Sequence, residues 1–261
     1  MVQPQPNDGF EWTQAQWGAV LRCRALLAVA DHFFTGASLE LRDSRAEWDA
    51  VAAEIKVDPQ RILLLRQVHG AGIAVARRGE YAAGPRPEAD IALTDDPTIA
   101  LGVRVADCSP ILIGDRRRGA VAAVHAGWRG TVQGAAIAAV RAMEEQWQSQ
   151  PADLVAAIGP CLGPCCGEVG PEVVDDFRNA GHAPDMVARW LTRGRADRFQ
   201  LDLPGANRDQ LAAAGVPASQ IHVAGLCTKS FPEVFHSYRV KKEGAGRMVA
   251  IIRVNTEKAE G

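Results

Sequence analysis

The chain has 261 residues, 47% hydrophobic and 23% charged, which is typical of a globular protein with one large domain or two small ones. Its 29 lysines and arginines face 31 acidic residues, so a small-molecule substrate is favoured over nucleic acid. The first residues, MVQPQPNDGF, lack the features of a secretory signal, and no apolar run approaches the length of a membrane span. Six dispersed cysteines suit reduced thiols, so we expect a cytoplasmic protein.

The first half of the chain predicts short buried strands and one helix. Residues 1–24 are predicted to be an N-terminal extension, ahead of a single catalytic domain over 25–261. Ser44 and Glu47 form a capping-box pattern before an amphipathic helix that ends near Ile55. Apolar runs bounded by glycine, proline or aspartate predict strands at 25–34, 62–68, 73–76, 98–105, 111–113 and 120–125.

The second half predicts more helices. The sequence GDRRRG at 114–119 indicates a solvated hairpin turn rather than an anion site. Helical patterns cover residues from Thr131 to about Trp147, then 171–180, 184–191 and 205–214. Strands are predicted at 154–158, 199–203, 221–226 and 247–254. Hairpin and crossover connections alternate irregularly, so we predict one α/β (α+β) domain with mixed β-sheets rather than a repeating barrel.

Three reactive side chains stand at the ends of predicted strands. His69 ends LLLRQVH, and His125 ends VAAVH ahead of a turn that begins at Gly127. Cys108 follows another strand, where Pro110 prevents simple continuation of the pairing. Sites carried on loops gather at such positions. The other four histidines have no supporting chemistry nearby and are interpreted as structural or surface residues.

Two imidazoles and one thiolate suit zinc or copper rather than magnesium or calcium. Three protein ligands also leave one tetrahedral position open, as catalytic zinc sites do. The spacing from His69 to Cys108 and His125 is long, with no CxxC or HxxxH pair. From the residues alone, therefore, both alternatives stay open: a metal site, or three polar groups that never meet.

Several motifs occur together in one known family. They are QVHG at 67–70, ADCSPI at 106–111, VHAGWRGT at 124–131, IGPCLGPCCGEVG at 158–170 and LCTKSFPEVFHSYR at 226–239. With these motifs the chain resembles the YfiH family, also called the multicopper polyphenol oxidase or laccase-domain family, over roughly residues 30–254. The resemblance implies a YfiH-like fold of packed mixed sheets with helices outside. It also implies zinc, with copper as the alternative ion, held by His69, Cys108 and His125.

The resemblance further implies a purine nucleoside phosphorylase with adenosine deaminase activity. Such an enzyme splits adenosine, inosine and methylthioadenosine with phosphate, giving the base and ribose 1-phosphate. Its partners would be purine nucleosides and phosphate, with neither nucleic acid nor membrane, and either a monomer or a homodimer is compatible with the sequence. Six histidines and no HxH motif make copper-dependent phenol oxidation a side reaction at most.

Three more residues are assigned roles at this site. Asp107 is predicted to be a general acid/base or a partner that orients a ligand, although an aspartate at a strand end can equally cap a turn. Arg129, in the turn that opens the next helix, and Arg239 are predicted to bind phosphate, with structural salt bridges as the alternative. The loop cysteines Cys161, Cys165 and Cys166 are interpreted as packing residues rather than a second metal site.

The chain also departs from the family pattern. Residues 32–41, HFFTGASLEL, lack the arginine and the glycine pair of a common Thr-Thr-Arg-x-Gly-Gly stretch, so we expect weak phosphate binding and a larger share of deamination.

One rival interpretation is a metal-free hydrolase with Cys108 as nucleophile and His125 as base. A non-enzymatic metal-binding or docking protein is another. His69 distinguishes the hydrolase, because a Cys–His pair needs no second imidazole.

Overall fold

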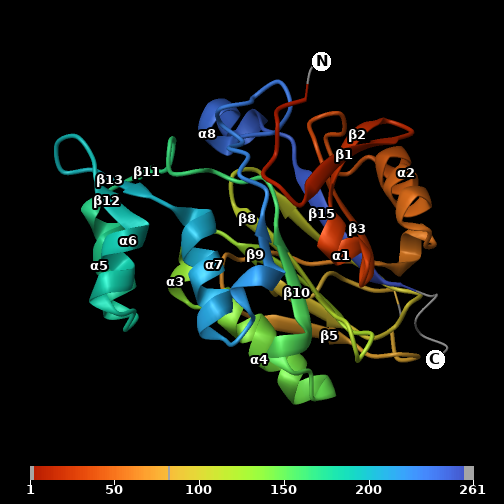
Figure 1. The fold of residues 1–261 in the computed structure, drawn as a ribbon. Helices are drawn as coiled ribbons and strands as arrows, with labels where there is room; N and C mark the ends of the chain where they lie inside the picture. Colours follow the sequence, from red (N-terminus) through yellow and green to blue (C-terminus); the bar gives the residue numbers. More distant parts are fainter. Residues whose placement is uncertain (1–2, 82, 256–261) are drawn as a thin grey trace.

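Two six-stranded mixed sheets form the centre of the protein (Figure 1). The computed structural model describes residues 3–81 and 83–255. The first sheet contains, in spatial order, β1 (Phe10–Ala15), β2 (Gly18–Cys23), β3 (Ala30–Thr35), β15 (Met248–Val254), β7 (Ala100–Val105) and β4 (Ile62–Leu64). The second contains β14 (Ile221–Val223), β10 (Leu154–Ile158), β8 (Ser109–Asp115), β9 (Val121–Ala126), β6 (Ile91–Thr94) and β5 (Ile73–Ala76).

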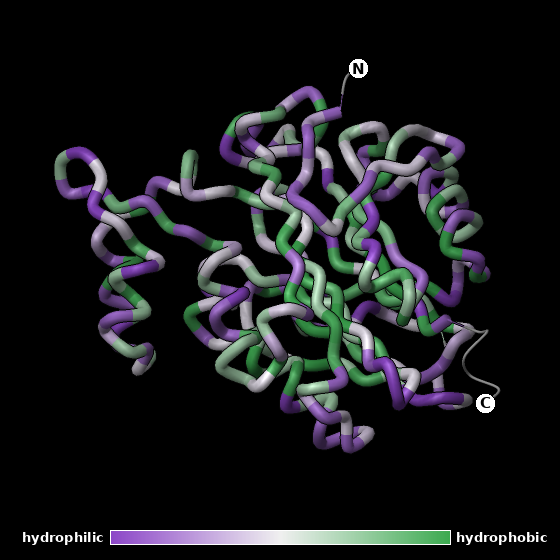
Figure 2. The backbone as a smooth tube through the Cα atoms, in the orientation of Figure 1, coloured by the Kyte–Doolittle hydropathy of each residue, from purple (hydrophilic) through white to green (hydrophobic). Residues whose placement is uncertain are grey.

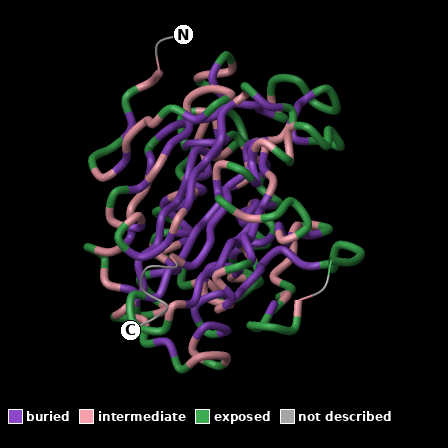
Figure 3. Tube along the Cα trace, turned by 90° about the vertical axis from the view of Figure 1, so that its right-hand side faces the viewer, coloured by how far each residue is buried: buried purple, intermediate pink, exposed green. Residues whose placement is uncertain are grey.

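The main core lies between these two sheets. Leu101 and Ile252 of the first sheet and Leu112 and Ala123 of the second belong to one cluster of buried side chains. Figure 2 shows the central strands as predominantly hydrophobic, and Figure 3 shows them as buried. Because both faces of these strands are covered, their sequences are nearly continuous apolar runs rather than alternating patterns.

Helices cover the outer faces of the sandwich. The eight α-helices within the described residues are α1 (Arg24–Leu27), α2 (Arg45–Ile55), α3 (Trp128–Val132), α4 (Ala135–Trp147), α5 (Pro171–Asn179), α6 (Pro184–Trp190), α7 (Leu203–Ala213) and α8 (Tyr238–Lys241). Buried residues of α4 and α7 pack on the second sheet, and those of α2 pack on the first. Within the same described residues, single 3₁₀ turns occupy Pro59–Arg61, Pro151–Asp153, Ala218–Gln220 and Lys242–Gly244.

A lateral lobe carries a third, small sheet (Figure 1). Its strands are β11 (Glu168–Val169), β13 (Phe199–Leu201) and β12 (Leu191–Arg193). Phe177 of α5 and Trp190 of α6 are almost completely buried beside this sheet, with ring centroids 5.7 Å apart. None of the helices within 3–81 and 83–255 combines the length and hydrophobicity needed to cross a bilayer.

The predicted α+β domain with mixed sheets is confirmed, and several strands match closely. Strand 154–158 is β10 residue for residue. GDRRRG forms the predicted turn between β8 and β9, where Asp115 Oδ1 accepts hydrogen bonds from the N–H groups of Arg117 and Arg118.

Other sequence predictions differ from the structure. The segment 25–34 is not one strand, because α1 occupies its start and β3 begins only at Ala30. The predicted strand 62–68 is also too long, since β4 ends at Leu64. Residues 10–23, within the predicted N-terminal extension, form the β1–β2 hairpin at the edge of the first sheet.

Two helix predictions also need correction. The helix expected from Thr131 is broken into α3 and α4 at Gly134, whose φ of +73° is left-handed. Helix α2 is present, but Ser44 makes no capping hydrogen bond. The carboxylate of Glu47 instead accepts the N–H groups of Glu40 and Leu41, each at 2.9 Å.

Candidate metal centre and substrate cleft

The fold brings together the three predicted metal ligands. His69 lies in the loop after β4, Cys108 between β7 and β8, and His125 in β9. Their ligand atoms all lie within 4.8 Å of one another. The antiparallel pairing of Pro110 with His125 accounts for part of this, because it sets the start of β8 beside the end of β9. Of the two alternatives left open by the sequence, the structure therefore supports a shared site.

Gln67 fixes the loop that carries His69. Its side-chain amide donates to the carbonyl of Arg104 at 2.8 Å and accepts the N–H of the same residue at 2.9 Å. The loop is thereby attached to the end of β7, four residues before Cys108. His69 itself adopts a φ of +63°, a conformation uncommon for a residue with a side chain. Such a conformation persists only where surrounding contacts hold it.

Asp90 supplies those contacts for the His69 backbone and orients the imidazole of His125. Its Oδ1 lies 2.7 Å from His125 Nδ1, which donates to it and so leaves Nε2 available for a metal. The carboxylate also accepts the N–H groups of Val68, His69 and Gly70 at 3.2, 3.0 and 2.7 Å. Burial alone would raise the pKa of Asp90, but these hydrogen bonds lower it, so the group is charged at neutral pH. No motif in the sequence had pointed to Asp90.

Gly127 allows the close packing of the ligands. A Cβ atom at this position would lie 2.8 Å from Cys108 Sγ and 3.3 Å from His69 Cδ2. Both distances are shorter than ordinary contacts, and Cys108 and His69 could not move away without changing the geometry of the triad. The glycine of the HAGWRG motif is therefore required by space rather than by its φ of −67°.

Charge within the triad favours a thiolate on Cys108 and a protonated imidazole on His125. Burial alone would raise the pKa of the Cys108 thiol, but the adjacent His125 and His69 rings lower it to about 6. Burial alone would lower the pKa of His125, but Cys108 and Asp90 raise it to about 9. Cys108 and His125 thus form a thiolate–imidazolium pair, and a bound metal ion would replace the proton on the imidazole.

The triad opens into a cleft of about 1000 Å³, the upper end of the range for small-molecule sites. Part of its lining is apolar and comes from α3, from β11 and β13 of the lateral lobe, from the loop before β11 and from the start of α7. The residues of this apolar wall are Trp128, Leu162, Val169, Leu201 and Leu203. A flat heterocycle is the class of ligand that such a wall accommodates.

Arginines dominate the polar lining of this cleft. Seven line it, namely Arg42, Arg66, Arg86, Arg104, Arg129, Arg239 and Arg247, against the acidic residues Asp43, Asp107 and Glu243. Arg66 is neutralised by an ion pair with Glu88. Among the described residues, no carboxylate forms an ion pair with Arg86, Arg104 or Arg247.

These last three arginines repel one another. Burial is the largest cause that lowers the pKa of Arg104, and the charges of Arg86 and Arg247 lower it further, against a smaller opposing effect of Asp43. A cluster of unneutralised cations is stabilised by an anion, so this part of the cleft is suited to phosphate. The sequence analysis expected weak phosphate binding because residues 32–41 lack an arginine of the family pattern. The cluster brings positive charge to the cleft from other segments, and the strength of phosphate binding stays a prediction.

The structure places Asp107, Arg129 and Arg239 on the same cleft. Asp107 has a φ of +84°, and its two carboxylate oxygens accept hydrogen bonds from Thr228 Oγ1 and from the backbone N–H of Arg239, each at 2.6 Å. This geometry favours an orienting role over proton transfer. Arg129 is exposed, with its guanidinium 4.2 Å from the centre of the Trp128 ring. Neither arginine forms a salt bridge within the described part of the chain.

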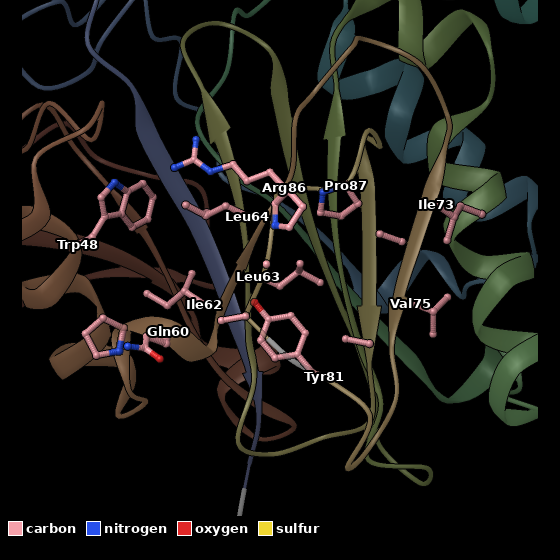
Figure 4. A pocket seen from close by; sticks show the side chains of 16 residues that line it. Trp48, Gln60, Ile62, Leu63, Leu64, Ile73, Val75, Tyr81, Arg86 and Pro87 are labelled. Carbon is pink, nitrogen blue, oxygen red and sulfur yellow. The ribbon is translucent and has the colours of Figure 1, made fainter.

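A second hollow of about 640 Å³ lies between β4 and β5 (Figure 4). Ile62 and Leu64 come from one strand, Ile73 and Val75 from the other, and Tyr81 is drawn between them (Figure 4). No histidine, cysteine or acidic residue lines it within the described chain. The residues predicted to carry chemistry line the larger cleft instead.

Comparison with known proteins identifies the family. Residues 41–255 match the family described as multi-copper polyphenol oxidoreductase laccase, and the chain belongs to this family. The crystal structure of the hypothetical protein YfiH from Bacillus licheniformis superposes with a TM-score of 0.80 at 29% identity, covering 90% of this chain and 96% of that one. The predicted YfiH resemblance and fold are thereby confirmed.

Two relatives carry names that describe activities. The purine nucleoside phosphorylase of Bacteroides thetaiotaomicron is 36% identical over 166 residues. That alignment covers 64% of this chain and 61% of the relative, which is less than two thirds of its length. Adenosine deaminase RL5, from an unknown prokaryotic organism, is 36% identical over 218 residues and 80% of each chain.

Proposed function

We propose that this protein is a zinc-dependent purine nucleoside phosphorylase with adenosine deaminase activity, and that copper is the alternative ion. It would convert adenosine, inosine and methylthioadenosine to the free base and ribose 1-phosphate. One observation carries the proposal: the His69–Cys108–His125 triad shares a single cleft with the Arg86–Arg104–Arg247 cluster. The names of the two relatives support both activities.

The triad fits a catalytic metal. Two imidazoles and one thiolate are the donors that zinc and copper accept, and Asp90 leaves the Nε2 atom of His125 free. A bound ion supplies Lewis acidity, which lowers the pKa of a water molecule and makes it a nucleophile near neutral pH. Attack of water on C6 of adenine, with loss of ammonia, gives the deamination product.

The arginine cluster fits the phosphate needed for the second activity. In phosphorolysis a phosphate oxygen bonds to C1′ of the ribose while the bond from C1′ to the purine nitrogen breaks, and the purine takes up a proton. Arg86, Arg104 and Arg247 would hold the phosphate by charge-assisted hydrogen bonds. The apolar wall formed by Trp128 and Leu203 would hold the base. Asp107 would position Cys108, its neighbour, through the fixed turn described above.

Adenosine turnover tests the assignment of the metal triad. Wild-type protein incubated with adenosine and phosphate should yield adenine, inosine or both, and His125→Ala and Cys108→Ala should yield neither. Metal analysis should find about one zinc per wild-type chain and none in Cys108→Ala. Full metal content in the cysteine variant would contradict the ligand assignment.

A phosphate titration tests the arginine cluster. Loss of one charge-assisted contact costs roughly 1.5 to 3 kcal/mol, so Arg104→Gln should raise the KM for phosphate about 10- to 100-fold. Deamination, which needs no phosphate, should persist in the same variant. Arg118→Gln, in the hairpin between β8 and β9, is the matched control. Equal phosphate dependence in both variants would exclude the cluster as the phosphate site.

The geometry also supports one rival function, a Cys–His hydrolase. The thiolate–imidazolium pair of Cys108 and His125, oriented by Asp90, is the arrangement that such a nucleophile requires. Chelation distinguishes the two functions, because a hydrolase would keep its turnover after complete metal removal and the proposed enzyme would lose it.

A further inference from the structure

A cluster of three cysteines lies outside the His69–Cys108–His125 triad. The Sγ atoms of Cys165, Cys166 and Cys227 all lie within 4.8 Å of one another. Cys165 is exposed, Cys166 is half-buried and Cys227 is buried, and none forms a disulfide. The sequence interpretation had assigned the first two to loop packing, and it could not associate them with a cysteine about 60 residues further along the chain.

Backbone hydrogen bonds hold the cluster in shape. One turn is closed by the Cys166 N–H donating to the Gly163 carbonyl at 3.0 Å, and the other by the Ser230 N–H donating to the Cys227 carbonyl at 3.2 Å. An isolated β-bridge between the backbones of Cys161 and Cys227 joins the two turns. Because the backbone fixes both turns, little conformational entropy remains to be lost when a ligand binds.

Space and hydrogen bonding around the sulfurs also suit a ligand site. A Cβ atom at Gly163 would lie only 3.3 Å from Cys227 Cβ, so a larger residue would crowd the cluster. Ser230 Oγ lies 3.5 and 3.6 Å from the Sγ atoms of Cys165 and Cys166. Burial alone would raise the pKa of Cys227, but hydrogen bonds from Ser230 and the Gly163 N–H lower it to about 7, while burial and the neighbouring Cys227 raise the pKa of Cys165.

We propose that Cys165, Cys166 and Cys227 form a second metal site, which binds one Cu(I) ion through three thiolates. Purely sulfur ligands select soft ions such as Cu(I) over magnesium, calcium or manganese. Structural zinc almost always takes four protein ligands, and the described residues place no fourth cysteine, histidine or carboxylate with these three. The cluster therefore favours Cu(I) over Zn²⁺.

This site is chemically distinct from the triad, but hydrogen bonds connect the two. Thr228, next to Cys227, donates its hydroxyl to Asp107, and the Leu162 N–H donates to the Asp107 carbonyl at 2.8 Å. Both turns are therefore attached to the residue that precedes Cys108. For this reason the site is tested by binding and spectroscopy rather than by turnover.

The test uses the full-length, reduced protein with zinc bound, kept free of oxygen. Cu(I) is titrated in competition with bicinchoninate, a chromophoric Cu(I) chelator. The wild-type chain should bind one Cu(I) ion. Cys165→Ala and Cys227→Ala should bind it more than about 100-fold less tightly, because losing a ligand weakens metal binding more than losing a contact that supports a ligand. Cys165 is exposed, so its alanine variant should fold normally.

Two controls locate the ion. Cys161→Ala removes a neighbouring thiol that is outside the cluster and should leave the affinity for Cu(I) unchanged. His125→Ala should also retain the Cu(I) while it loses the zinc, so failure of the proposed nucleoside activity and failure of this proposal are separable. X-ray absorption at the copper edge should show three sulfur neighbours and no nitrogen.

Three results would overturn the proposal. The first is an unchanged Cu(I) affinity in Cys165→Ala, and the second is a nitrogen ligand in the absorption spectrum, which would place the copper at the histidines. The third is a disulfide between two of the three cysteines that persists in protein prepared under reducing conditions. It would be seen as a mass two hydrogens below that of the fully reduced chain, and it would remove two of the thiolates.

Discussion

Replacing Asp90 by asparagine should weaken both metal binding and the stability of the fold. The carboxylate accepts four hydrogen bonds, from His125 Nδ1 and from three consecutive backbone N–H groups that include that of His69. An amide keeps one acceptor oxygen and turns its NH₂ group toward donors. Loss of such a supporting contact lowers metal affinity about 10- to 100-fold, which corresponds to about 1.4 to 2.7 kcal/mol. The unsatisfied buried N–H groups should cost about 1 to 3 kcal/mol of stability.

Competition with a chromophoric zinc chelator measures the affinity, and denaturant unfolding measures the stability. Asp96→Asn is the matched control, because Asp96 is also buried and accepts hydrogen bonds from Thr98 and Gly79, yet lies outside the site. It should lose stability without losing affinity for zinc. If Asp90→Asn folds and binds zinc as tightly as the wild type, the role assigned to Asp90 is refuted.

Two further predictions concern other residues. Gly127→Ala should lower zinc affinity at least tenfold in the chelator assay, because its Cβ would press against Cys108 Sγ, and a wild-type affinity would contradict the packing argument. His32 accepts the Cys23 N–H at Nε2, and complete burial lowers its pKa from 6.5 to about 4. The unfolded chain therefore binds the proton first as the pH falls, and the free energy of unfolding should drop by about 3 kcal/mol between pH 6.5 and 4. Denaturant unfolding should show this drop reduced in His32→Gln, and an identical pH dependence in the variant would count against it.

Local sequence determined most of the secondary structure of this protein. The apolar runs at 73–76 and 154–158 coincide with β5 and β10, because a short apolar run bounded by turn residues has few alternatives to a strand. Where the prediction was wrong, tertiary contacts decided. Residues 24–27 form a turn of helix although their apolar run suggests a strand. The chain after Leu64 leaves the sheet because hydrogen bonds of Gln67 with Arg104 and of the His69 N–H with Asp90 hold it as a loop.

The predicted ligands His69, Cys108 and His125 were also recognised from sequence, because each stands beside a turn at a strand end and their motifs resemble those of one family. The groups that support them were not. Asp90 joins His125 across 35 residues, the arginine cluster combines positions 86, 104 and 247, and Cys227 joins Cys165 across 62 residues. Periodicity reports only which face of an element is buried. Contacts between distant segments depend on strand register and on how the two sheets pack. Only the tertiary structure therefore decided the charge of the cleft and the position of the three clustered cysteines.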